Sequence, residues 1–300
     1  MTVTTLGRRR RRRLPDRARP WLLLAPALLV ITILFVGALL FGVLQSLNYL
    51  PLIGLTEPNL DAYASIFGDP VFWESLGLSL RIAFLSTGIS IVLAVASALL
   101  IFHTDRGRRG ITFIYQFNLP IPHIVGGVAM LLLLSQSGLF SRVGFALGLT
   151  DAPADFPALT NDRWGFAIIA EYVWKETVFI GVVVLAALSG GVAEYEELAR
   201  TLGAARWKRF WHVILPLITP AIVSTSIIVF AFSFGAFEIP FLLGQPYPAA
   251  LPVMAYRSYT DVDLNSRPEA MAISVVIATI VAVLVFVYMW VGRRYVRQDA

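Results

Sequence analysis

The stretch GGVAEYEELARTLGAARWKRFWHVILPLITP, residues 190–220, lies between two apolar segments and is itself rich in charged residues. Gly203 divides it in two, and glycine commonly follows the last turn of a helix because it accepts a left-handed backbone. Before this glycine, four apolar residues recur at the i, i+3, i+4 and i+7 positions of one helical face: Tyr195, Leu198, Ala199 and Leu202. This half therefore predicts a short helix that stops at Gly203.

After Gly203 the same spacing recurs in a second set of apolar residues: Trp207, Phe210, Trp211 and Ile214. Basic residues and His212 occupy the other side, and Pro216 is predicted to end or kink this second helix. The segment from about 190 to 216 is therefore predicted to form a helix–turn–helix outside the hydrocarbon.

The residues of this segment leave two interpretations open. An interfacial helix pair that only connects two membrane spans suits the half with tryptophan and basic residues. Docking to a protein partner suits the acidic half, EYEELA, because an anionic inner leaflet repels acidic side chains. We favour docking, since an acidic helix with a small apolar face has little to gain at a membrane surface.

The composition of the whole chain indicates a membrane protein. Of 300 residues, 57% are hydrophobic and only 14% are charged, whereas a soluble domain carries roughly 25% charge. The chain has no cysteine, which excludes disulfides and thiolate metal sites. Its 3 histidines are scattered, so we expect neither a metal nor a cofactor.

Six apolar runs are long enough to cross roughly 30 Å of hydrocarbon. They lie at about 21–46, 78–102, 111–135, 165–189, 217–243 and 268–292. The fold class is therefore an all-α membrane protein, with a transmembrane domain at 21–292, a basic tail at 1–20 and a short tail at 293–300. The third run contains NLPIPHIVGG, whose prolines and glycines predict a broken helix.

Most of the 24 lysines and arginines fall in four segments: the N-terminal tail, the connection after the second run, residues 190–216 and the C-terminal tail. Cytoplasmic segments carry such an excess, so both termini are predicted to be cytoplasmic, in a bacterial inner membrane. The arginine run at 8–13 resembles a nucleic-acid arm in composition alone. Beside a first span we interpret it as a topology determinant that contacts anionic lipid, and we expect no nucleic acid.

The opening stretch resembles the EAA loop of permease subunits of binding-protein-dependent ABC importers. The family pattern is E-A-A, three residues, glycine, nine residues and I-x-L-P. Its positions fall here on Glu197, Leu198, Ala199 and Gly203, and then on residues 213–216, VILP. Leu198 replaces the first alanine and Val213 the isoleucine, and both remain apolar. The resemblance covers about residues 20–295 and implies the type I permease fold.

The resemblance implies a coupling helix that docks in a cleft of a separate ATPase. Glu197 would pair with a basic residue there, Tyr195, Leu198 and Ala199 would fill the cleft, Gly203 would make the turn, and Pro216 closes the motif. The implied partners are an ATPase dimer, a second similar but non-identical permease and an extracytoplasmic solute-binding protein. The chain has no G-x-x-x-x-G-K-[ST] loop, so we expect a permease subunit and not an enzyme.

Two sequence segments, TLGAARWKRFWHVILP at the motif and SFGAFEIPFLLG further along, resemble those of the branch of the family that imports polyamines, opines, phosphonates, thiamine or iron. Ionisable residues in the spans are candidates for the solute path: Glu171, Lys175, Glu176 and Glu238. Alternatively, Glu171 and Lys175 pair along one helix, being four residues apart. The carboxylates suit a cationic solute such as a polyamine, and His123 is expected to be a packing or hydrogen-bonding residue.

Other functions are less consistent with the sequence. A sugar or glycerophosphodiester importer would use the same fold. An intramembrane enzyme needs a cluster of acid, base or nucleophile, which the spans lack. A secondary carrier usually carries repeats with matching interruptions, and none is visible.

Overall fold

A computed structural model describes residues 19–296 of the chain. Within this range the chain folds into helices, with a single isolated bridge between Leu50 and Leu55. Six helical stretches are long and apolar enough to cross a membrane, which confirms the all-α membrane class. The arginine run at 8–13 and the end of the C-terminal tail, 297–300, lie outside the described residues.

The first two spans are α1 (Arg19–Ser46) and α3 (Pro70–Phe102). Between them lie a 3-10 turn (Pro51–Ile53) and α2 (Asp61–Gly68). Helix α3 begins before the predicted boundary at 78, because Asp69 caps it and Pro70 fits its first turn. The Oδ1 atom of Asp69 accepts a hydrogen bond of 2.9 Å from the backbone N–H of Val71.

The third span is broken, as predicted. The predicted run 111–135 covers α4 (Arg108–Gln116) and α5 (His123–Leu134), with Pro120 and Pro122 in the gap, and the stretch long and apolar enough to cross a membrane begins only at α5, over His123–Ala146. Each proline lacks a backbone N–H and disfavours a helical residue before it. Helix α6 (Leu139–Ala146) and a 3-10 turn (Pro153–Asp155) then lead to the fourth span.

The fourth and fifth spans run into the helix–turn–helix. Helix α7 (Phe166–Ala187) leads into α8 (Ala193–Thr201) through a kink at Leu188–Val192, where Gly190 and Gly191 have non-helical backbone angles. Helix α9 (Arg206–Arg209) continues through a π-helical turn (Phe210–Ile214) into α10 (Leu215–Gly235). Of the two outcomes expected at Pro216, an end or a kink, the end does not occur: the helix is distorted into the π-helical turn directly before this proline, which then occupies the first turn of α10.

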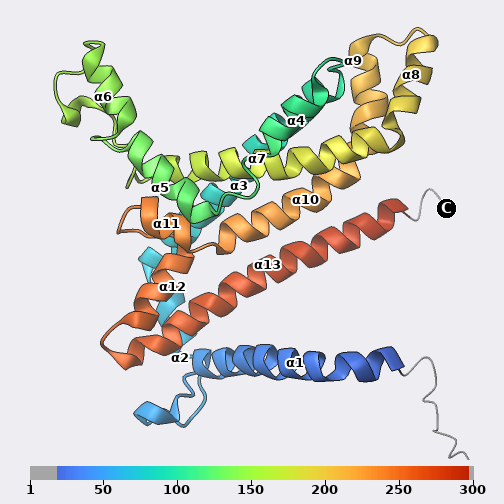
Figure 1. Ribbon diagram of the computed structural model, residues 1–300. Coiled ribbons are helices and arrows are strands. Elements are labelled where there is room, and N and C mark those ends of the chain that lie inside the picture. The colour runs from blue at the N-terminus through green and yellow to red at the C-terminus, as the bar shows by residue number, and fades with distance from the viewer. Residues whose placement is uncertain (1–18, 297–300) are drawn as a thin grey trace, which may run out of the picture.

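The predicted fifth run, 217–243, is also interrupted. Helix α10 ends at Gly235, and a separate short helix, α11 (Glu238–Leu243), follows. Helix α12 (Leu251–Thr260), a 3-10 turn (Leu264–Ser266) and the last span, α13 (Arg267–Val296), complete the chain. In Figure 1, α8, α9, the start of α1 and the end of α13 lie toward one side of the molecule, and α6, α11 and α12 toward the other.

The core joins the second, fourth and fifth spans. Helices α3 and α7 pack along each other most extensively, and α10 packs against both. The small buried side chains of Ala94 and Ala98 let α3 approach Ile180 and Val184 of α7 closely. This packing fixes α7, which carries Glu171, Lys175 and Glu176 and leads into α8, the helix with the predicted coupling residues.

Candidate functional site

The turn of the helix–turn–helix is made by Gly203, as predicted. Its φ is +81°, and a Cβ atom there would meet nothing within 4 Å, so the left-handed backbone rather than crowding requires glycine. The backbone N–H groups of Gly203 and Ala204 donate to the carbonyls of Arg200 and Ala199, both at 3.0 Å. These bonds satisfy the last carbonyls of α8 and fix where it ends.

The predicted coupling residues form an exposed surface on α8. Tyr195 and Leu198 are each 58% exposed, and Glu197 beside them is exposed too. Among residues 19–296, Glu197 makes no ion pair or side-chain hydrogen bond. Ala199 is half-buried against the rest of the helix pair. An apolar patch with an unpaired carboxylate is typical of a surface that contacts a partner.

Glu196, which the sequence did not single out, ties the two helices together. Its Oε1 atom lies 3.5 Å from Nε of Arg209 and 3.2 Å from Nε2 of His103, at the end of α3. The side chains of Glu196 and Arg209 are only 14% and 13% exposed. Arg209 also donates from Nη1 to the carbonyl of Ala204 at 2.9 Å. Glu196, Arg209 and His103, here called the clamp, thus connect α8, α9 and α3.

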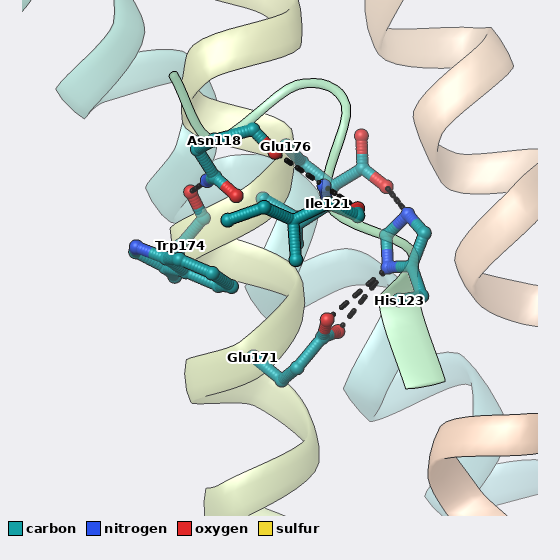
Figure 2. A network of polar contacts seen from close by, with 7 residues as sticks. Asn118, Ile121, His123, Glu171, Trp174 and Glu176 are labelled. Atoms are coloured by element: carbon teal, nitrogen blue, oxygen red, sulfur yellow. Dashed lines mark hydrogen bonds and ion pairs between the residues drawn. The ribbon is translucent and has the colours of Figure 1, made fainter. Parts of the chain in front are cut away.

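A second group of polar residues surrounds the break in the third span (Figure 2). The Nζ atom of Lys175, on α7, donates to the carbonyls of Asn118 at 2.8 Å and Ile121 at 2.6 Å. The Nδ2 atom of Asn118 donates to the carbonyl of Trp174 at 2.8 Å. Backbone groups freed by a broken helix need such partners in a membrane. Lys175 therefore stabilises the break.

The alternative that Glu171 and Lys175 pair along α7 is wrong: within residues 19–296 the two form no ion pair. Both carboxylates of α7 instead face His123, the first residue of α5 (Figure 2). The Nδ1 atom of His123 lies 3.2 Å from Oε1 of Glu171, and Nε2 lies 4.0 Å from Oε1 of Glu176. This confirms His123 as a hydrogen-bonding residue.

The surroundings of His123 are tightly packed. Glu171 is fully buried, and a Cβ atom at Gly126 would lie 2.7 Å from its Oε1 atom. Glycine at 126 is therefore what allows α5 to approach the carboxylate. The ring of Phe232 on α10 lies 4.8 Å from the ring of His123, and that of Tyr172 lies 6.2 Å away. The sequence did not single out Phe232 and Tyr172, because aromatic residues are common in membrane spans.

Three of the four residues predicted for the solute path, Glu171, Lys175 and Glu176, share one site around His123, here called the polar cluster. Glu238 lies exposed in the first turn of α11 and makes no ion pair or side-chain hydrogen bond within residues 19–296. It borders the cluster, because its carboxylate acts electrostatically on Tyr172.

Residues 86–298 match the profile of a family described as the binding-protein-dependent transport system inner membrane component. The chain belongs to this family. It is accordingly a multi-pass membrane protein and a permease subunit of a binding-protein-dependent ABC importer. The resemblance seen in residues 190–220 is thereby confirmed at the level of the family.

Several relatives carry different solute names. The chain is 27% identical over 238 residues to the putrescine transport system permease protein PotI of Escherichia coli (strain K12), covering 79% of this chain and 78% of PotI. It is 30% identical over 307 residues to the trehalose transport system permease protein SugA of Mycobacterium tuberculosis (strain ATCC 25618 / H37Rv), covering 96% and 92%. Family membership therefore leaves the solute open.

A solved structure agrees with the fold. A crystal structure of a bacterial ABC transporter involved in the import of the acidic polysaccharide alginate superposes with a TM-score of 0.76 at 24% identity, covering 93% of this chain and 97% of that one. At this identity the likeness establishes the type I permease fold and nothing about the solute.

Proposed function

We propose that this permease receives the movement of a separate ATPase dimer through α8 and passes it to the membrane helices around the polar cluster. The observation that carries this proposal is the exposed surface of Tyr195, Glu197 and Leu198 on a helix whose orientation the clamp fixes. An exposed apolar patch next to an unpaired acid suits an apolar cleft rimmed by basic residues. In this proposal ATP hydrolysis is assigned to the partner subunit, in keeping with the family to which the chain belongs.

The two adjacent glutamates of α8 have different roles in this proposal. Glu196 is turned inward and its carboxylate contacts Arg209 and His103, so it positions α8. Glu197 is exposed and unpaired within the described chain, so it remains available to a basic residue of the ATPase. Gly203 sets the angle at which this surface is presented, because the turn after α8 requires a residue with a left-handed backbone conformation.

The remaining partners follow from the same placement. We expect a second, similar but non-identical permease, an extracytoplasmic solute-binding protein and an ATPase dimer. We propose that both termini are cytoplasmic, in the bacterial inner membrane. In support, the start of α1, the end of α13 and the α8–α9 pair lie toward one side of the molecule (Figure 1), the side that an ATPase would occupy.

We propose that the polar cluster lines the solute path. Ionisable groups at membrane depth are costly and usually face a cavity or one another. While His123 is neutral, the two carboxylates Glu171 and Glu176 exceed the one lysine by one negative charge, and the charge of Lys175 is engaged with backbone carbonyls. This negative charge favours a small cationic solute of the polyamine class. A neutral sugar is a second candidate, because the rings of Tyr172 and Phe232 beside His123 offer apolar faces on which a sugar stacks.

The coupling proposal is tested in the complete transporter reconstituted in lipid nanodiscs. Glu197→Lys and Gly203→Val should each abolish the ATP hydrolysis that the solute-loaded binding protein stimulates, while membrane insertion and assembly stay intact. Glu194→Lys is the matched control, since Glu194 is exposed on the same helix and the charge change is the same. If stimulation and transport survive both changes, α8 is not where the ATPase couples.

The solute is tested separately. Thermal-shift measurements on the cognate binding protein should show stabilisation by polyamines, and Glu176→Gln in the permease should then lower polyamine transport. Stabilisation by sugars alone would replace the cationic solute by the second candidate. Stabilisation by phosphonates alone would contradict both, because two carboxylates repel an anion.

A further inference from the structure

A groove lies between α4 and α7, on the same side of the molecule as the helix–turn–helix. Its volume is about 560 Å³. The α4 wall begins with Arg108 and Arg109, followed by Thr112 and Gln116 about one and two turns further along, and it also includes Phe113. The α7 wall is mostly apolar, with Val182, Leu185 and Ala186. The proposed function uses none of these residues.

The two arginines lie at the start of α4, close to the ends of two spans. They follow closely on Phe102, where α3 ends, and Arg108 contacts Ser189, just after the end of α7. Arg108 is half-buried: its Nη2 atom donates to Oγ of Ser189 at 3.0 Å, and its guanidinium lies 5.5 Å from the centre of the Phe102 ring. Arg109 is exposed and, among residues 19–296, makes no hydrogen bond or ion pair. One guanidinium is thus fixed at the mouth of the groove, and the other is available.

We propose that this groove binds one anionic phospholipid. The phosphate of the headgroup would contact Arg108 and Arg109, the glycerol and ester oxygens would lie at the depth of Thr112 and Gln116, and an acyl chain would run along the α7 wall. The groove has two arginines at one end and offers both polar and apolar groups between its walls, which are the kinds of group that an anionic phospholipid contacts. The site goes beyond the proposed function and does not depend on it.

Other occupants fit less well. A soluble phosphate or carboxylate would use the arginines but would leave Val182, Leu185 and Ala186 without a partner. A zwitterionic phospholipid would cover the apolar wall but would gain little from the positive charge of Arg109. Each basic residue near an anionic membrane surface strengthens lipid binding by about fivefold. Arg109 should therefore contribute about that factor for an anionic headgroup and much less for a neutral one.

The position of the groove gives the lipid a mechanical consequence. Ser189, which holds Arg108, is followed by Gly190 and Gly191, where the helix kinks between α7 and α8. Gly191 has a φ of +125°, and a Cβ atom there would meet nothing within 4 Å. A headgroup bound to Arg108 would thus act on the start of this kink. We expect anionic lipid to change the rate of coupled ATP hydrolysis as well as to bind.

The test uses the assembled transporter with the full-length chain. The complex is stripped of lipid in detergent and titrated with phosphatidylglycerol or phosphatidylcholine, and bound lipid is counted by native mass spectrometry. Phosphatidylglycerol should bind preferentially. Arg109→Gln should weaken its binding about fivefold, whereas Arg106→Gln, an equal charge change at an exposed arginine that does not line the groove, should leave it within twofold.

A second variant tests the apolar wall without changing charge. Ala186→Trp should fill the groove and lower phosphatidylglycerol binding at least as much as Arg109→Gln does. Equal effects of Arg106→Gln and Arg109→Gln would overturn the proposal in favour of diffuse electrostatic attraction. Unchanged binding in Ala186→Trp, or full displacement of the lipid by millimolar glycerol phosphate, would overturn it in favour of a site for soluble anions.

Discussion

Glu196→Gln should loosen the helix–turn–helix without altering the surface that α8 presents. The substitution removes the charge that lies 3.5 Å from Nε of Arg209 and 3.2 Å from Nε2 of His103, and it keeps the shape of the side chain. At an effective dielectric constant of about 20, two charges 3.5 Å apart attract by about 5 kcal/mol. Desolvation and side-chain ordering offset most of this attraction.

The net contribution of the Glu196–Arg209 pair to local stability lies between those of two kinds of interaction. Exposed ion pairs contribute about 0–1 kcal/mol, and hydrogen bonds to charged groups about 1.5–3 kcal/mol. Because the two side chains are 14% and 13% exposed, the clamp belongs between these cases. We therefore expect Glu196→Gln to cost about 1–2 kcal/mol, which corresponds to local opening about 5- to 30-fold more often.

Hydrogen–deuterium exchange of peptides covering residues 193–209, in the reconstituted transporter, measures this opening. Glu194→Gln is the control, because Glu194 is exposed on the same helix and has no partner within the described chain. Arg209→Gln alone should accelerate exchange similarly, and the double variant should add little to either single change. Equal exchange in Glu194→Gln and Glu196→Gln, or additive effects of the two clamp changes, would refute the clamp.

Three further predictions concern stability and the turn. Lys175→Met leaves the carbonyls of Asn118 and Ile121 without their charged donor and should lower stability by about 2–4 kcal/mol, seen as a lower thermal midpoint in detergent; an unchanged midpoint would contradict the role of Lys175. Gly126→Ala should cost about 1–3 kcal/mol because its Cβ would lie 2.7 Å from Oε1 of Glu171, whereas Gly88→Ala, with open space, should be neutral or stabilising in the same measurement. Gly203→Asn should keep solute-stimulated ATP hydrolysis, because asparagine tolerates a left-handed backbone; a loss equal to that of Gly203→Val would show that the turn needs more than this conformation.

Local patterns in the sequence were sufficient for much of the fold. The length of the apolar runs predicted the spans, the prolines of NLPIPHIVGG predicted the break between α4 and α5, and Gly203 predicted the end of α8. Each of these depends on neighbours within one or two turns. At Pro216 the sequence left an end and a kink open, because the π-helical turn that lets the helix continue has no clear local pattern.

The contacts that make the sites were not predictable in the same way. Glu196 and Arg209 are separated by the turn, and His103 comes from the end of another span. Lys175 lies four residues from Glu171, so helical spacing favoured an ion pair that the packing of α5 does not allow. Because Gly126 lets α5 approach α7 closely, His123 contacts Glu171. That contact depends on tertiary structure alone.

Helix α7 carries the polar cluster at one end and continues into the coupling surface at the other, yet it is not a rigid rod. The kink at Gly190 and Gly191 separates the two parts, and glycine at a positive φ bends at low cost. A push on α8 would be absorbed there if α8 were attached only to α7. The clamp provides other connections, through His103 to α3 and through Arg209 to α9 and then α10. Because α3 and α10 both pack on α7 within the membrane, we expect movement of α8 to displace this helix group together and so to reach the break that Lys175 holds.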